Sequence, residues 1–318
     1  MIYATIAEID KPLSRFVYGT PRAVTKEFSE EVYDLYDMAW AKGFRAFDTA
    51  NSYGMAEENL GRWILKSGHR AEMVLLDKGC NPGQNGSSDV YSPKTIRDQL
   101  TRSLDKLNTD YTDLYILHRD DESRPIEEIV DVLNEQAALG RIKRFGGSNF
   151  KLYRVQRANA YANAHGLKGF SVLSPNFCLA RLVNDPWGGS VTISGDENKD
   201  FRDWLSQNQM PVFNYSGLGR GFLSGKYKTG FDIHACLPEG PIKEYYAPEN
   251  TQRLARAEKL AAQKGVSTAA IALAWLLSRP LNLFPIICPT GETHIDEALK
   301  AFEVSLTQQE ADYLYYGL

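Results

Sequence analysis

Short apolar runs recur along the whole chain, and their alternation with helical segments constrains the fold more than any other feature. Eight runs have strand character, namely Phe16–Gly19, Phe44–Thr49, Met73–Lys78, Asp113–His118, Arg144–Ser148, Phe170–Ser174, Pro211–Tyr215 and Phe284–Cys288. Longer segments with apolar residues at helical spacing lie between several of them, namely Ser29–Lys42, Pro93–Leu107, Ile126–Leu139 and Leu152–His165. Because strands that alternate with helices form parallel sheets, eight such runs predict a closed (β/α)8 TIM barrel.

The positions of glycine and proline predict where helices end and where loops lie. Gly43, Gly140 and Gly166 each follow a helical segment and are expected to end it. The alternating stretch before Phe16 predicts a β-hairpin. Two segments rich in Gly, Pro, Asn and Asp, Pro175–Lys199 and Leu237–Asn250, lack periodicity and are expected to form loops over the active face.

Composition limits the class of protein. The 318 residues fit one barrel, so a single domain over residues 1–318 is expected. Hydrophobic residues make up 43% of the chain, enough for a large core, and the net charge of -4 gives no overall basic field for nucleic acid or an anionic membrane. The sequence contains no apolar stretch typical of a signal peptide or a membrane span, so a cytoplasmic protein is expected.

The four cysteines are widely separated, which disfavours both a zinc site and a disulfide framework. They are Cys80, Cys178, Cys236 and Cys288, and we interpret them as reduced thiols. Cys80 lies close to a strand end, where it is either a wall position or a side chain facing the site.

Four ionisable side chains lie at or just beyond the ends of successive strand-like runs in the first third of the chain. They are Asp48 and Tyr53 in FDTANSYG, Lys78 in LLDKG and His118 in YILHRD. Parallel barrel strands present their carboxyl ends at one mouth, where catalytic residues gather. Each residue alone has an ordinary explanation, such as rim packing for the tyrosine, a helix cap for the aspartate or a core position for the histidine. Their fixed order in these contexts favours a joint role.

In these residues the chain resembles the aldo-keto reductases, whose Asp, Tyr, Lys and His tetrad occupies the same strand ends. The resemblance implies nicotinamide-dependent reduction of aldehydes or ketones, and a hairpin that closes the barrel bottom. It also implies that Tyr53 donates the proton and that His118 orients the carbonyl. A free phenol has a pKa of about 10 and is a weak acid, but a nearby ammonium such as that of Lys78 stabilises the phenolate. Asp48 would keep that ammonium charged and aimed.

The resemblance also implies the cofactor site, because no GxGxxG follows the first strand and a Rossmann site is not supported. Ser148 and Asn149 match residues that hold the nicotinamide carboxamide, and Tyr215 matches the aromatic residue that stacks on the ring. The remaining cofactor positions carried over are Gly19, Thr20, Ser174, Ser216, Leu218, Gly219, Thr290, His294 and Glu297. Glycines in the segment from Gly217 to Gly225 would let backbone donors approach the pyrophosphate, unless they only form a tight turn.

Two departures from the family pattern bear on the cofactor. Ser174 stands where a glutamine is usual, and Phe177 stands where a tyrosine is common. In the segment PIICPTGETHIDEA, Thr290 and His294 occupy the region where the family often places Lys or Arg against the adenosine 2'-phosphate. A phosphate favours a strong cation, and histidine near neutrality is only fractionally charged. NADPH is the family expectation, and NADH or dual use stays open.

Several alternatives remain at this stage. The same residues would serve a sugar or alcohol dehydrogenase that uses NAD in the oxidative direction, or a cofactor-binding regulatory barrel. A metal-dependent hydrolase is disfavoured by five scattered histidines. The partner expected is a small-molecule carbonyl compound, with no nucleic acid and no membrane. Trp187, Tyr245 and Tyr246 are either pocket walls or loop packing, and the sequence leaves the substrate and the oligomeric state open.

Overall fold

A computed structural model describes residues 1–20, 30–82, 91–185 and 187–318. The chain divides into two compact units. The N-terminal unit comprises residues 2–174, and the C-terminal unit comprises residues 175–318 together with Met1.

The N-terminal unit is built on a parallel sheet whose strands neighbour one another in chain order. The strands are β3 (Val17–Gly19), β4 (Ala46–Ala50), β5 (Val74–Gly79), β6 (Thr112–Leu117), β7 (Ile142–Gly147) and β8 (Val172–Leu173). Every residue of β4, β5 and β6 is buried. Burial on both faces is typical of a parallel sheet covered by helices, and it explains why these strands are nearly continuous apolar runs.

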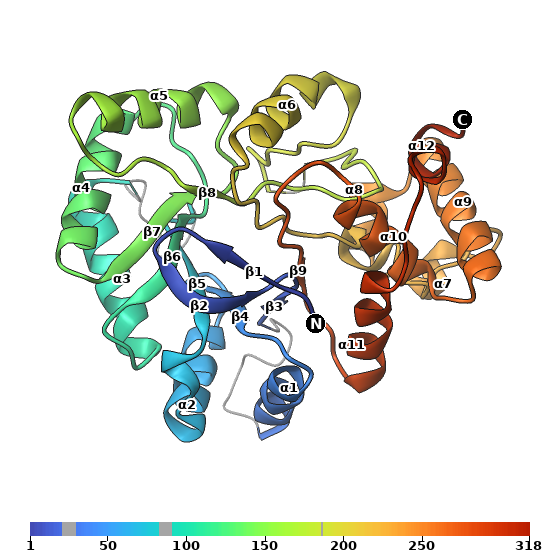
Figure 1. The fold of residues 1–318 in the computed structure, drawn as a ribbon, viewed down its shortest axis with the longest axis horizontal. Helices are drawn as coiled ribbons and strands as arrows, with labels where there is room; N and C mark the ends of the chain where they lie inside the picture. The colour runs from blue at the N-terminus through green and yellow to red at the C-terminus, as the bar shows by residue number, and fades with distance from the viewer. Residues whose placement is uncertain (21–29, 83–90, 186) are drawn as a thin grey trace. The chain divides into compact units, whose positions relative to one another are not determined.

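Five α-helices connect these strands and cover the outer face of the sheet (Figure 1). They are α1 (Glu30–Ala41), α2 (Ala56–Ser67), α3 (Pro93–Lys106), α4 (Ile126–Ala138) and α5 (Leu152–Ala164), with the short helix η1 (His69–Ala71) after α2. Gly43, Gly140 and Gly166 have φ of +93°, +75° and +66°, so the predicted helix stops are confirmed. Ser29, the first residue of one predicted helix, lies outside the described residues.

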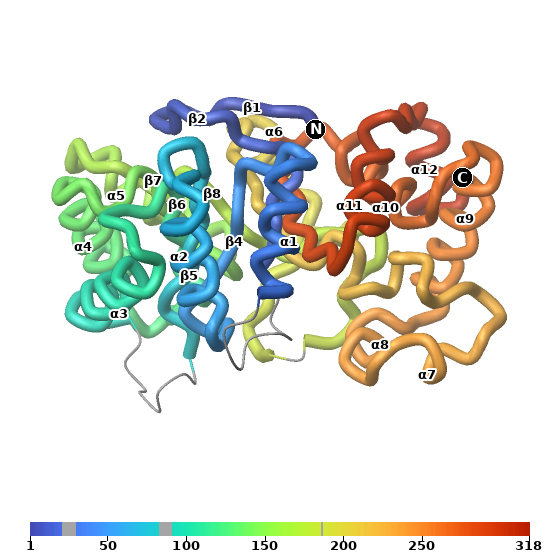
Figure 2. Tube along the Cα trace, turned by 90° about the horizontal axis from the view of Figure 1, so that it is seen from below, coloured from blue at the N-terminus to red at the C-terminus, as the bar shows by residue number. Residues whose placement is uncertain are grey.

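The predicted N-terminal hairpin is confirmed as strands β1 (Tyr3–Ile6) and β2 (Ile9–Ser14), which pair antiparallel. It lies across the amino end of the strands (Figure 2). Lys11 of β2 fixes it there, because its Nζ donates to the carbonyl oxygen of Met73 at 2.7 Å and lies 2.9 Å from an oxygen of Asp113 at the start of β6. Arg70 reaches the same carboxylate at 2.9 Å.

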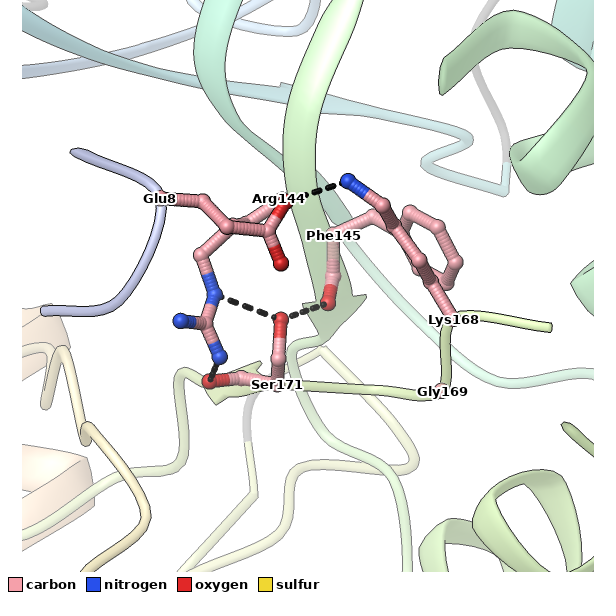
Figure 3. A pocket seen from close by; sticks show the side chains of 6 residues that line it. All are labelled: Glu8, Arg144, Phe145, Lys168, Gly169 and Ser171. Atoms are coloured by element: carbon pink, nitrogen blue, oxygen red, sulfur yellow. Dashed lines mark hydrogen bonds and ion pairs between the residues drawn. The ribbon is translucent and has the colours of Figure 1, made fainter. Parts of the chain in front are cut away.

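A small pocket opens beside this hairpin (Figure 3). The residues that line it are Glu8, Arg144, Phe145, Lys168, Gly169 and Ser171. Its charged side chains already have partners within the protein. Arg144 donates to the Ser171 hydroxyl at 2.9 Å and to the Ala7 carbonyl at 2.7 Å, and Lys168 pairs with Glu8. The pocket therefore belongs to the closure of the barrel bottom.

The C-terminal unit is mainly helical. Its helices are α6 (Lys199–Asn208), α7 (Ile233–Cys236), α8 (Glu239–Tyr245), α9 (Pro248–Lys264), α10 (Thr268–Leu277), α11 (Glu292–Leu299) and α12 (Gln308–Tyr316), with short turns η2 (Asp196–Asn198), η3 (Gly219–Gly221) and η4 (Lys300–Phe302). Strand β9 (Ile286–Ile287) also belongs to this unit. Helix α10 is apolar on all sides and forms the core against α9, α11 and η4.

Among the described residues, no single helix is both long and apolar enough to cross a bilayer. Helices α9 and α10 meet that test only together, as a pair bent by 101°.

Two expectations from the sequence are wrong in this unit. The run Pro211–Tyr215 forms no continuous strand, and it contributes isolated bridges from Val212 to Leu283 and from Tyr215 to Asn176. The segment Leu237–Asn250 is not an irregular loop, since it contains α8 and the first turn of α9. Gly240 and Pro241 suggested a break, but proline is tolerated in a first helical turn, and the apolar residues of α8 then fall on one buried face.

Candidate active site

Strand register places three of the four predicted catalytic residues on one face of the sheet. Lys78 pairs with Ala50 on one side and with Ile116 on the other. Residues opposite each other on neighbouring strands share a face, and the side-chain period of a strand is two. Asp48, two residues before Ala50, and His118, two residues after Ile116, therefore lie on the Lys78 face. His118 remains tied to β5, because its N–H donates to the Gly79 carbonyl at 2.7 Å.

These residues form a contiguous cluster at the carboxyl ends of β4, β5 and β6. Lys78 Nζ pairs with Asp48 Oδ1, and both side chains are almost completely buried. The same Nζ lies 5.3 Å from the centre of the Tyr53 ring. The Tyr53 and His118 rings meet edge to face with their centroids 5.7 Å apart. The structure thus brings Asp48, Tyr53, Lys78 and His118 together.

Tyr53 projects from the turn that follows β4. Its N–H donates to the Ala50 carbonyl at 3.0 Å, and the Ala56 N–H donates to the Tyr53 carbonyl at 3.3 Å, just where α2 begins. Its side chain is half-buried, whereas Lys78 and Asp48 are closed off. The cluster therefore has a buried ion pair behind an accessible phenol.

Ser52 is a neighbour of this cluster that the sequence did not single out. Its Oγ lies 3.4 Å from His118 Nδ1. The side chain of Asn149 contacts the same residue from the other side, because its Nδ2 donates to the His118 carbonyl at 3.0 Å. The only sequence signal for Ser52 was its position beside Tyr53.

The electrostatics of the cluster suit proton donation. A buried ammonium is costly unless a carboxylate faces it, and here Asp48 meets that need. The pair places the Lys78 ammonium beside the Tyr53 ring. A neighbouring imidazole adds a hydrogen-bonding group at a point where a substrate oxygen could be held.

Five of the predicted cofactor residues lie in the N-terminal unit. Ser148 and Asn149 follow β7, and Ser174 follows β8. Ser148 Oγ donates to the Ser174 carbonyl at 2.7 Å, and Asn149 Nδ2 lies 2.9 Å from Ser148 Oγ. These three residues and His118 are thus joined by hydrogen bonds. The other two, Gly19 and Thr20, follow β3, where the Thr20 N–H donates to the Asp48 carbonyl at 2.9 Å.

The remaining predicted cofactor residues lie in the C-terminal unit in two groups. The first is the turn that contains Tyr215, Ser216, Leu218 and Gly219. Ser216 and Gly219 have φ of +56° and +58°, and the Gly219 N–H donates to the Ser216 carbonyl at 2.8 Å. This is a tight turn of the kind that exposes backbone donors.

The second group surrounds the start of α11. Thr290 Oγ1 lies 3.0 Å from His294 Nδ1, and both side chains are exposed. Glu297 lies one turn further along the same helix and is half-buried. No Lys or Arg occurs in the sequence from 285 to 299.

The three aromatic residues suggested as pocket walls differ in exposure. Tyr245 is buried, and its hydroxyl accepts a hydrogen bond from Asn176 Nδ2 at 2.9 Å, so it packs inside the C-terminal unit. Trp187 and Tyr246 are exposed. The Arg220 guanidinium lies 5.2 Å from the centre of the Trp187 ring and pairs with the buried Glu244.

Cys80 is a buried residue that does not extend the site. Burial raises the pKa of its thiol to about 12. Since the thiolate is the reactive form, Cys80 is an inert wall residue at neutral pH.

Comparison with known proteins places the chain in a family. The sequence profile of the Aldo/keto reductase family matches residues 17–315. The norsolorinic acid reductase stcV of Emericella nidulans is 29% identical over 302 residues, which cover 91% of this chain and 72% of that protein. The aldo-keto reductase yakc of Schizosaccharomyces pombe, whose name specifies NADP(+), is 28% identical over 277 residues, which cover 83% of this chain and 76% of that protein.

A solved structure gives the same result for the fold. The glycerol dehydrogenase AKR11B4 of Gluconobacter oxydans matches with a TM-score of 0.78 and 22% identity, over 98% of this chain and 93% of that one. The predicted (β/α)8 barrel with an N-terminal hairpin is therefore confirmed. Members of the matched family are oxidoreductases that generally use nicotinamide cofactors and act on small carbonyl compounds. The chain belongs to the Aldo/keto reductase family.

Proposed function

We propose that this protein reduces an aldehyde or ketone to an alcohol, with Tyr53 as the general acid. The observation that carries the proposal is the buried Lys78–Asp48 pair beside the Tyr53 ring, with His118 edge to face against it. Reduction leaves negative charge on the carbonyl oxygen, and a proton donor at that point lowers the barrier.

Each residue of the cluster has one task in this mechanism. His118 holds the carbonyl oxygen, and the Tyr53 hydroxyl delivers the proton to it. Lys78 stabilises the phenolate that is left, and Asp48 keeps Lys78 charged in a buried position. The nicotinamide cofactor, when bound, supplies the hydride. Ser148 and Asn149 offer a hydroxyl and an amide of the right chemistry to hold its carboxamide, with Ser174 adjoining them.

We propose NADPH as the cofactor, with NADH as an open alternative. The NADP(+) in the name of yakc supports the first. The lack of Lys or Arg around Thr290 and His294 supports the second, because a 2'-phosphate favours a strong cation. The other predicted contacts, from Gly19 and Thr20 and from the turn Tyr215–Gly219, do not discriminate between the two.

An NAD-dependent dehydrogenase that works in the oxidative direction is the second candidate. The same cation-poor segment favours it, because NAD lacks the 2'-phosphate that a strong cation would bind. We further propose that residues 1–318 act as one domain, since the family profile extends across both units.

The test is the initial rate of NADPH and NADH oxidation with a panel of aldehydes and ketones, run beside Tyr53→Phe. Turnover that falls at least about a hundredfold in the variant supports the proposal. Turnover of alcohols with NAD but none of carbonyls would favour the dehydrogenase. Tight cofactor binding with no turnover in either direction would leave a regulatory role.

A further inference from the structure

Arg154 is a buried cation close to the candidate site that the mechanism above does not use. It lies in the first turn of α5, and only 3% of its side chain is exposed. Its guanidinium faces Asp120, with Nε 2.8 Å from Oδ2 and Nη2 2.9 Å from Oδ1. This is the two-point geometry that makes Arg–carboxylate pairs both strong and directional.

The same guanidinium also binds the main chain of the loop after β6. Nη2 donates to the Asp121 carbonyl at 3.2 Å, and Nη1 donates to the Arg124 carbonyl at 3.2 Å. One side chain thus fixes a loop that begins at His118. Burial raises the pKa of Asp120 even with Arg154 beside it. Desolvation lowers the pKa of Arg154, but the hydrogen bond and charge of Asp120 outweigh this and raise it, so the pair forms despite a desolvation cost.

Two further hydrogen bonds join the segment after β7 to the start of the loop after β6. Asn149 Nδ2 donates to the His118 carbonyl, and the Ser148 N–H donates to the Leu117 carbonyl at 2.7 Å. The stretch from Ser148 to Arg154 is therefore hydrogen-bonded to the loop after β6 at the start of the loop and again further along it. One hydrogen-bonded frame thus fixes the main chain of His118 relative to Ser148 and Asn149, the two residues proposed to hold the cofactor amide.

We propose that Arg154 is a positioning residue of the active site, which fixes the loop carrying His118 relative to Ser148 and Asn149. The inference rests on the proposed function. It differs from a general stabilising role, because a buried pair of apolar residues would stabilise the fold as well. What an apolar pair cannot do is hold one carboxylate and two carbonyls at defined angles.

The chain offers a matched control on the same helix. Arg157 lies one turn further along α5, 59% of its side chain is exposed, and its guanidinium pairs with Glu127 of α4 at 2.8 Å rather than with the loop after β6. Arg154→Gln and Arg157→Gln make the same chemical change at neighbouring turns, one inside the frame and one outside it.

Both variants would be made in the wild-type chain and in His118→Ala, and kcat/KM for a carbonyl substrate measured. We expect Arg154→Gln to lose about tenfold to a hundredfold, since small misplacements of a catalytic group have effects of that size. Arg157→Gln should stay within about twofold. In the His118→Ala background the effect of Arg154→Gln should nearly vanish, because residues that act as one unit are not additive. Arg154→Lys keeps the positive charge but cannot make the two-point contact with Asp120, so its kcat/KM should be little higher than that of Arg154→Gln.

Two further measurements keep the proposal falsifiable. If Arg154→Gln folds poorly, the pair Arg154→Gln with Asp120→Asn removes both charges, and it should fold yet keep the loss in kcat/KM. The NMR resonances of the His118 imidazole should shift in Arg154→Gln and not in Arg157→Gln, whether or not the protein turns over a carbonyl.

The outcomes separate the two proposals. If the wild-type chain turns over no carbonyl, the reductase proposal is wrong. The positioning role is then tested only by whether the His118 resonances shift in Arg154→Gln and not in Arg157→Gln. Wild-type turnover with equal behaviour of the two glutamine variants overturns the positioning role and leaves the reductase proposal standing. Fully additive losses with His118→Ala would also overturn it, because Arg154 would then act elsewhere.

Discussion

The Lys78–Asp48 pair is the residue-scale feature on which the site depends. Lys78→Met leaves the Asp48 carboxylate buried without its partner, and we expect a loss of about 3–5 kcal/mol in the free energy of unfolding. The rate of carbonyl reduction should fall at least about a hundredfold. Urea unfolding and initial rates measure the two effects. Adding Asp48→Asn should recover most of the stability and none of the rate, and a Lys78→Met variant with wild-type stability would contradict this account.

Asp77, next to Lys78 in the sequence, predicts a pH dependence of stability. It pairs in register with Tyr115 on the opposite face of the sheet, where Glu57 of α2 is also buried. Burial, with a further contribution from Glu57, raises the pKa of Asp77 well above its usual value. The folded state then holds a proton that the unfolded chain loses above about pH 4, so this group makes the protein less stable as the pH rises from that point.

Asp77→Asn removes this titration without changing the shape of the side chain. Its urea midpoint should exceed that of the wild type at pH 8, and the difference should shrink towards pH 4. Asp98→Asn, at an exposed position on α3, is the control and should show no such gain. A wild-type midpoint equal to that of Asp77→Asn at every pH would show that Asp77 does not titrate between the two states.

Strand position was enough to predict that Asp48, Tyr53, Lys78 and His118 lie together, because parallel strands end at one edge. Their catalytic roles came from residue type together with the family resemblance and stay a prediction. The residues that the sequence missed, Ser52 and Arg154, contact the loop after β6 from other segments of the chain. Such contacts depend on how a loop folds, and no periodicity in the chain encodes them. The proposed cofactor residues of the C-terminal unit came from the family resemblance and not from any local pattern.

At the scale of elements, the hairpin is held to the sheet by a polar contact. Lys11 donates to the Met73 carbonyl and contacts the Asp113 carboxylate, which Arg70 also reaches. Lys11→Met should therefore cost about 1–3 kcal/mol, since Arg70 still pairs with the Asp113 carboxylate and Lys143 lies 3.6 Å from it. Lys94→Met, which removes an ion pair on the surface of α3, should cost no more than about 1 kcal/mol. Equal urea midpoints for the two variants would show that the hairpin does not depend on Lys11.

The contact between β7 and β8 requires a glycine. A Cβ on Gly146 would lie 1.7 Å from the Val172 carbonyl oxygen, a backbone atom that no rotamer change can move away. Gly146→Ala should destabilise the fold by at least about 3 kcal/mol. Gly291→Ala meets no atom within 4 Å at an extended φ of 170° and should cost no more than about 1 kcal/mol, the loss of a favourable N-cap residue of α11. Similar thermal midpoints for the two alanine variants would contradict the register of these strands.

The elements that the sequence predicted well are those with a strong period. The buried strands β4, β5 and β6 and the amphipathic helices α3, α4 and α5 fall within a few residues of the expected bounds. The wrong predictions concern segments whose sequence has no strong period. Pro211–Tyr215 has the composition of a strand but only isolated bridges, and α8 was hidden by Gly240 and Pro241.

At the scale of the whole molecule, the single-domain proposal predicts one cooperative unfolding transition. Calorimetry should show one peak for the full chain although the fold has two compact units. Saturating NADPH should move the whole peak upward, by about 2.7 kcal/mol of added stability at a hundred times its Kd. Two peaks, of which only one responds to the cofactor, would show that the units unfold separately.

The central claim is that the tetrad supports hydride transfer from a bound nicotinamide cofactor to a carbonyl carbon by protonating the carbonyl oxygen, and isotope transfer tests it most directly. The protein would be incubated with a reactive aldehyde and NADPH deuterated at the transferred position of the nicotinamide, with the deuterated NADH run in parallel. Mass spectrometry of the alcohol would then show whether the label has arrived. We predict one deuterium on the carbinol carbon with at least one of the two cofactors, and almost none in Tyr53→Phe over the same time. Bound cofactor with no label in the alcohol, or equal labelling by the wild type and Tyr53→Phe, would contradict the account.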